Sequence, residues 1–87
     1  MTVETVHSTT VVGKCPLGCP DLYAAEFRVS GPTVLPIEEI DAAIAALTAE
    51  PVYQEDLTRR LASRLGCAVV TRGTHGRFAT ECRAVPA

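Results

Sequence analysis

The sequence predicts an α+β fold with the element order strand, strand, helix, helix, strand, strand. Apolar and polar residues alternate in stretches near both ends of the chain, and apolar residues recur every three or four positions in the middle. A chain of 87 residues, 47% hydrophobic, is long enough for one domain (residues 1–87) and too short for two. We expect a four-stranded antiparallel sheet with both helices on one face.

The first two strands are predicted on either side of a turn. Residues 3–12 ("VETVHSTTVV") are rich in Thr and Val, which favour strands. A turn rich in Gly, Pro and Cys follows over residues 13–20, and residues 23–29 then alternate between apolar and polar side chains. The rings of Tyr23 and Phe27 are expected to pack in the core, with stacking on a bound ligand as the alternative.

Two helices are predicted between the strand pairs. The first has its apolar residues at helical spacing and is expected to start at Pro36 and to end before Pro51; these apolar residues are Ile37, Ile40, Ile44 and Leu47. The second should run from about Tyr53 to Leu65, with Gly66 as its C-terminal cap.

The last two strands are predicted from the segments "CAVVTRG" and "RFATECRAV", joined by a turn over residues 73–76. The two strands at the edges of such a sheet have unpaired backbone groups. Identical subunits arranged in a ring could pair these edges and close a barrel.

The charge and hydropathy of the chain argue against nucleic-acid-binding and membrane-spanning proteins. The net charge is −2 with only eight Lys and Arg residues, which argues against a protein that binds nucleic acid on its own. No apolar run is long enough to span a membrane, and the N-terminal "MTVETVHSTT" does not resemble a signal peptide. We therefore expect a cytoplasmic protein whose thiols stay reduced.

The four cysteines allow several interpretations. Cys15 and Cys19 have a spacing that zinc sites use, but no second pair completes such a site, and the expected compartment disfavours disulfides. Cys67 and Cys82 are expected to be small apolar residues of the core. Cys15 follows a lysine in a turn rich in Gly and Pro, and Asp21 ends that turn, so these residues could act as a nucleophile and its acid.

The element order resembles the tunnelling fold, which is shared by enzymes that bind pterins and purines. Within that group, "CPLGCPD" resembles the turn of the nitrile reductases of queuosine biosynthesis, the QueF family. The resemblance implies that Cys15 attacks the nitrile carbon of 7-cyano-7-deazaguanine to form a covalent thioimide, and that Asp21 supplies the proton. One residue fewer separates the two here than in the family's usual turn.

Two further segments carry the resemblance. "VYQEDLTRRLASRL" resembles the family's segment with a His-Glu pair, which implies that Glu55 binds the edge of the deazapurine. Gln54 stands where the family has the His. "TRGTHGRF" is similar to the family's Arg-Gly hairpin, in which His75 could replace the missing imidazole, with a solvated turn as the alternative; Glu55 also has an alternative, because a helix dipole favours a first-turn carboxylate in any case.

The resemblance is closest to the short QueF-like amidinotransferases of archaea, which make archaeosine. The reductases carry a Lys-containing stretch that binds NADPH, whereas residues 32–58 here contain no Lys or Arg. The similarity therefore implies that ammonia converts the thioimide to an amidine, with no cofactor and no bound metal. NADPH enters only in the alternative of a nitrile reductase.

The resemblance also implies the partners. These are 7-cyano-7-deazaguanine, either as a free base or within tRNA or DNA, and further copies of the chain, because tunnelling-fold sites lie between subunits. Two rivals from other classes remain: a catalytically silent purine- or pterin-binding protein, and a small zinc-binding interaction module.

Overall fold

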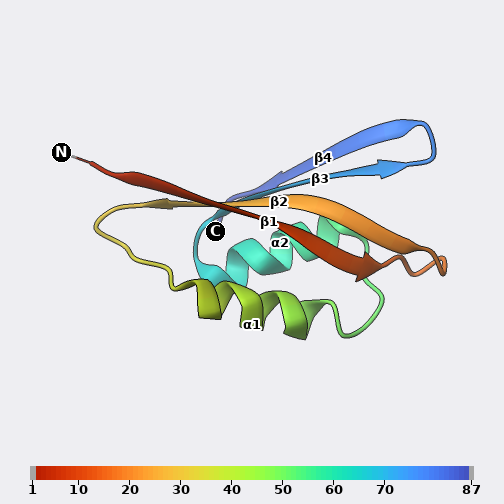
Figure 1. The fold of residues 1–87 in the computed structure, drawn as a ribbon, viewed down its shortest axis with the longest axis horizontal. Coiled ribbons are helices and arrows are strands. Elements are labelled where there is room, and N and C mark those ends of the chain that lie inside the picture. Colours follow the sequence, from red (N-terminus) through yellow and green to blue (C-terminus); the bar gives the residue numbers. More distant parts are fainter. Residues whose placement is uncertain (1, 87) are drawn as a thin grey trace.

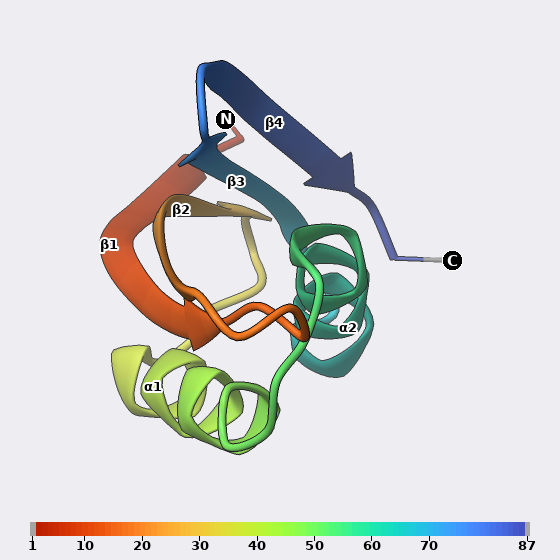
Figure 2. The ribbon, with the colours of Figure 1, turned by 90° about the vertical axis from the view of Figure 1, so that its right-hand side faces the viewer.

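The computed structural model describes residues 2–86, which form a four-stranded antiparallel sheet and two helices (Figure 1). The elements follow in the order β1 (Glu4–Lys14), β2 (Pro20–Ser30), α1 (Ile37–Leu47), α2 (Gln54–Leu65), β3 (Ala68–His75) and β4 (Phe78–Ala84). The sheet keeps the chain order β1-β2-β3-β4, and both helices lie on the same side of it (Figure 2). The predicted α+β class and element order are confirmed.

The hairpin of β1 and β2 is longer, and its turn shorter, than predicted. The two strands pair without interruption from Glu4 opposite Ser30 to Lys14 opposite Pro20. The turn closes where the Cys15 N–H donates to the Cys19 carbonyl and the Gly18 N–H to the Cys15 carbonyl, both at 2.8 Å. Gly18 has a φ of 97°, as the last residue of a three-residue hairpin loop requires. The turn therefore presents Cys15 directly at the end of a long strand.

The hairpin of β3 and β4 corrects the prediction of a turn over residues 73–76. Thr74 and His75 pair with Ala79 and Phe78, so only two residues, 76 and 77, form the turn. Gly73 lies within the strand, opposite Thr80, and a Cβ atom there would lie 2.7 Å from Cδ1 of Tyr23. The glycine that suggested a turn makes room for a ring, and His75 belongs to a strand.

The helices start one residue later than predicted. Pro36 and Tyr53 precede the first helical residues instead of being them, and Gly66 ends α2 in the left-handed conformation with a φ of 65°. Ile37 is 58% exposed, so it does not belong to the buried face of α1, where Ala43 is buried instead. The predicted apolar face of α1 is thus shifted by part of a turn.

The core lies between the sheet and the two helices. The residues buried to 1% exposure or less are mostly apolar side chains that point to this layer from all parts of the fold: Val11, Tyr23, Ala25, Phe27, Ala43, Leu57, Leu61, Ala62 and Val69, with Thr58 and Thr71 among them. Tyr23 and Phe27 are 1% and 0% exposed, so both side chains pack in the core, as expected. No helix found in residues 2–86 has the length and apolarity needed to cross a membrane.

Three connections meet at one end of the molecule. The β1–β2 turn, the α1–α2 loop and the β3–β4 turn lie at the same end in Figure 1. The Val52 N–H, in the α1–α2 loop, donates to the Lys14 carbonyl at 2.8 Å. This bond fixes the start of α2 beside the turn that carries Cys15.

Candidate active site

A cavity of about 260 Å³ opens at this end of the fold. Its walls come from the β1–β2 turn, the start of β2, the start of α2, the end of β3 and β4; the lining residues are Cys15, Leu17, Asp21, Tyr53, Gln54, Glu55, His75 and Thr80. The structure thus brings together all five residues that the sequence singled out, from segments up to 60 positions apart. The shorter Cys-to-Asp turn still lets both residues line one cavity.

Cys15 occupies the first position of the turn. Its thiol is partly buried, and the backbone N–H of Leu17 lies 3.5 Å from Sγ. An N–H donor aimed at sulfur is suited to a thiolate, which is the nucleophilic form of cysteine. The four cysteines are free thiols.

Asp21 is held at the cavity wall by a tyrosine from the core. Its side chain is 11% exposed, and the Tyr23 hydroxyl donates to Oδ2 at 2.8 Å. Burial, followed by the hydrogen bond to Asp21, raises the pKa of the Tyr23 phenol well above its usual value. Tyr23 therefore stays a protonated donor at any physiological pH.

Gln54 is almost fully buried, at 2% exposure, and its amide is surrounded by protein partners. Nε2 lies 3.2 Å from the carbonyl oxygens of Thr71 and Thr80 and from the Thr71 hydroxyl. Oε1 lies 2.9 Å from Nε2 of His75. The side chain thus connects the core to the imidazole at the cavity mouth.

His75 does not lie in a solvated turn, which was the alternative interpretation of the sequence, but at the end of β3. Its side chain is 40% exposed, but Nε2 meets Gln54 and Nδ1 lies 3.9 Å from Oδ1 of Asp21. The imidazole therefore lies between Gln54 and Asp21.

Glu55 is exposed in the first turn of α2. A carboxylate there is favoured by the helix dipole, and it also stands at the cavity wall with free acceptor capacity. Two carboxylate oxygens can accept the paired N–H groups along one edge of a guanine-like base.

The remaining cysteines do not line the cavity. Cys67 is buried, as predicted, although it lies just before β3, and burial raises its pKa. Cys82 is only partly buried; burial and then the charge of Glu55 raise its pKa. Across residues 2–86, no three His, Cys, Asp or Glu side chains gather in a way that could hold a metal ion.

Sequence reasoning missed three residues that line the cavity, and it missed the hydrogen bond from Tyr23 to Asp21. This bond could have been found, because residues two apart on a strand share a face and Asp21 lies two positions before Tyr23. Tyr53 directly precedes the predicted pair at the start of α2. Leu17 and Thr80 carry no signal in the sequence, because their places depend on the turn geometry and on the β4 register.

A larger hollow of about 460 Å³ lies near the start of β1. It is lined by Thr, Val, Gly and Pro residues, none of which has a titratable side chain. Size alone does not make it a reaction site, whereas the smaller cavity combines a thiol, two carboxylates and an imidazole.

No protein-family model, no curated protein and no solved structure matches this chain. The function proposed below rests on the residues of the cavity and on the resemblance of their motifs.

Proposed function

We propose that this protein converts the nitrile of 7-cyano-7-deazaguanine to an amidine through a covalent thioimide on Cys15. The observation that supports this most strongly is the single cavity shared by Cys15, Asp21, Glu55, Gln54 and His75. A thiol, a carboxyl group as acid and a second carboxylate for the base edge are the groups that such a reaction needs. The fold class agrees with a tunnelling-fold subunit, which we include in the proposal.

The first half of the reaction forms the thioimide. Glu55 accepts hydrogen bonds from the amino and ring N–H groups of the base, which places the nitrile beside Cys15. The thiolate sulfur bonds to the nitrile carbon, one π bond of the nitrile breaks, and the nitrogen takes a proton from Asp21. Holding the reactants together supplies much of the acceleration.

The second half uses ammonia. Its nitrogen adds to the thioimide carbon, the carbon–sulfur bond breaks, and Cys15 leaves as a thiolate. The atoms of nitrile and ammonia together make the amidine, so no oxidant or reductant is consumed. The reductase alternative needs a site for the NADPH phosphates, and residues 32–58 offer no cation for one.

A second copy of the chain is part of the proposal. The cavity, at about 260 Å³, lies just below the roughly 300–1,000 Å³ typical of small-molecule sites, which fits a site completed by another subunit. β1 and β4 stand at the two ends of the sheet order. Pairing of such edges between subunits would both close the sheet and add a wall.

The product distinguishes the proposal from its rivals. We expect protein incubated with 7-cyano-7-deazaguanine and ¹⁵N-ammonium to give an amidine that carries one ¹⁵N, and we expect Cys15→Ala to give none. Cys19→Ala is the matched control, because it changes a thiol of the same turn that does not line the cavity. Mass spectrometry of the small molecules reads the result.

Two other outcomes would contradict the proposed conversion of nitrile to amidine. NADPH-dependent formation of an aminomethyl product would establish the reductase. Tight binding of the nitrile without any conversion, unchanged in Cys15→Ala, would establish a silent binder.

A further inference from the structure

The buried polar network next to the cavity leaves only one arrangement of its protons. The Thr58 hydroxyl lies 2.7 Å from the Gln54 main-chain carbonyl, which can only accept, so Thr58 is the donor there. Its single hydroxyl proton is then used, and Thr71 must donate across the 2.7 Å contact to Thr58. Thr71 in turn accepts from the Gln54 amide.

The same reasoning fixes the orientation of the Gln54 amide. Two of its neighbours are the main-chain carbonyl oxygens of Thr71 and Thr80, which cannot donate, so the NH₂ group must face them. The amide oxygen consequently faces His75, and it can only accept. The contact at 2.9 Å therefore requires a proton on Nε2 of His75.

The tautomer of His75 follows from this contact. With Nε2 protonated in the neutral ring, Nδ1 carries a lone pair, and Nδ1 is the atom that faces Oδ1 of Asp21 at 3.9 Å. The other oxygen of Asp21 is occupied by the Tyr23 hydroxyl. Only Oδ1 is left to carry an acidic proton, and the lone pair of Nδ1 lies opposite it.

We propose that Asp21 and His75 hold one proton between Oδ1 and Nδ1 and lend it to the reaction, and that Gln54 is the positioning residue that makes this possible. The inference rests on the proposed function. It identifies the group that supplies the proton for thioimide formation and that takes a proton back when ammonia adds. The pair gives the proton to the nitrile nitrogen as the thioimide forms. When ammonia adds, its nitrogen has one proton too many for the amidine, and that proton returns to the pair.

The proton balance closes over one turnover. The pair ends as it began, and Cys15 is again a thiolate, so solvent supplies no net proton. Apo distances between acid–base partners commonly shorten when substrate binds, and we expect the 3.9 Å between Nδ1 and Oδ1 to shorten in the same way. The titratable groups that face His75 or share its cavity are Cys15, Asp21, Tyr53 and Glu55, with the Tyr23 ring 6.4 Å away between centroids.

The first test needs no substrate, so it stands or falls separately from the proposed function. ¹H–¹⁵N spectra of the imidazole rings in the free wild-type protein should show a visible, slowly exchanging proton on Nε2 of His75, whether or not Nδ1 also carries one. His7, which does not line the cavity, is the internal reference. An Nδ1–H tautomer, or exchange as fast as that of His7, would overturn the inference.

The second test reads the proton transfer itself. His75→Gln keeps a hydrogen-bonding side chain but removes the titrating ring, so amidine formation should fall on the order of 10²-fold and its pH profile should lose a limb. His7→Gln is the matched control and should change neither. Gln54→Met should alter the same limb of the profile. A pH profile unchanged in folded His75→Gln would contradict a shared proton, even if the rate fell.

If wild-type protein makes no amidine but His75 shows the protected Nε2–H tautomer, the proposed function fails and the fixed tautomer stands. If amidine forms while His75 is an Nδ1–H tautomer, the function stands and the proton pair fails.

Discussion

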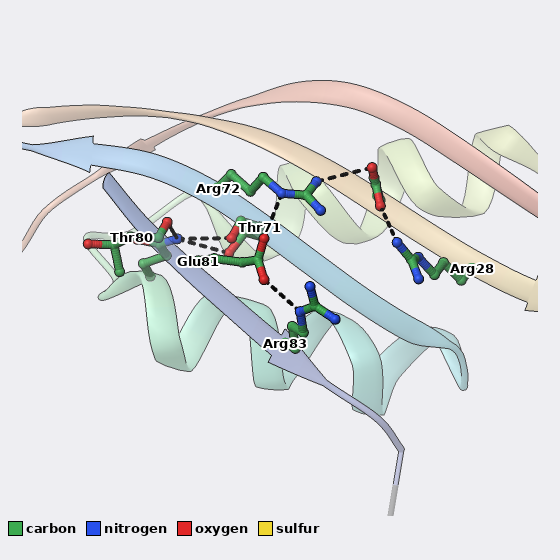
Figure 3. Close-up of polar contacts among 8 residues, drawn as sticks. Arg28, Thr71, Arg72, Thr80, Glu81 and Arg83 are labelled. Atoms are coloured by element: carbon green, nitrogen blue, oxygen red, sulfur yellow. Dashed lines mark hydrogen bonds and ion pairs between the residues drawn. The ribbon is translucent and has the colours of Figure 1, made fainter. Parts of the chain in front are cut away.

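Neighbouring residues of β3 belong to two polar networks in opposite surroundings. Thr71 points to the helix side, where it joins Thr58 and Gln54 in a network whose three residues are at most 2% exposed. Arg72 points to the other face, where it pairs with Glu26 and Glu81 (Figure 3). We call the first the inner network and the second the outer ladder.

The outer ladder continues on both sides through exposed arginines. Arg28 pairs with Glu26 at 2.9 Å and Arg83 with Glu81 at 2.6 Å, with these side chains 25–65% exposed. Exposed ion pairs of this kind add little stability, because water competes for both charges. Buried polar groups that lose a partner cannot turn to water, so each bond of the inner network matters more. Polar substitutions should therefore destabilise the fold more in the inner network than in the outer ladder. The candidate site is connected to the inner network, through Gln54.

The largest difference between the inner network and the outer ladder is expected when a charge is placed in the inner network. Gln54→Glu keeps the shape of the side chain but points carboxylate oxygens at the carbonyls of Thr71 and Thr80. We expect the free energy of unfolding at pH 7 to fall by about 3–5 kcal/mol, as for an unpaired buried charge. Since the protonated form fits best, stability should recover as the pH falls toward about 4. Urea unfolding at several pH values measures this, and a variant as stable as wild type at pH 7 would contradict a dry inner network.

A smaller effect is expected from removing one hydroxyl. Thr71→Val keeps the shape and deprives Thr58 of its donor and Gln54 of one acceptor. The free energy of unfolding should fall by about 1–3 kcal/mol. Thr74→Val, at an exposed position of the same strand, is the control and should change little. Equal losses in the two variants would remove the distinction between the faces.

Tyr23 connects the core to the cavity through Asp21, and its raised pKa should make the stability of the fold depend on pH at alkaline values. Its folded pKa is raised, chiefly by burial, so the stability it contributes is present below about pH 10 and is lost as the pH rises further. Tyr23→Phe should cost about 1–2 kcal/mol at neutral pH, through the lost bond to Asp21. It should also lack this alkaline loss. Unfolding curves between neutral pH and pH 11 compare the two proteins, and parallel curves would argue against the bond.

The smallest effect belongs to the outer ladder. Glu81→Gln breaks the pairs with Arg72 and Arg83, and its cost should be well below that of Thr71→Val and should shrink further as salt is added. Arg83, then Arg72, lower the pKa of Glu81, and Arg28, then Arg72, lower that of Glu26. The stability that these two carboxylates contribute is therefore present above about pH 4.3 and is lost as the pH falls below it. Thermal unfolding at low and high salt checks the ranking, which a large, salt-independent loss would reverse.

Periodicity was enough to predict the six elements, because each buries one face and the core-facing residues repeat at intervals of two or of three to four. The errors arose at residues with two possible roles. Gly13 and Gly73 were interpreted as turn residues, but both face the Tyr23 ring, which lies between them. That contact crosses three strands, so local sequence could not reveal it.

The candidate site was predictable in part for a similar reason. Cys15 and Asp21 are separated by only five residues, and Gln54 and Glu55 are adjacent, so motifs contain them. The bond between Gln54 and His75 depends on which residue of β3 faces α2, and that follows from the two-residue turn after His75. A turn placed two residues earlier would have left the imidazole in solvent.

The most direct test of the account is the mass of the intact protein after incubation with 7-cyano-7-deazaguanine, without ammonia. We predict an adduct of the mass of one base on wild type and on Cys19→Ala, and none on Cys15→Ala. Absence of the adduct from wild-type protein that binds the base, or an adduct that persists in Cys15→Ala, would contradict the thioimide and the function built on it.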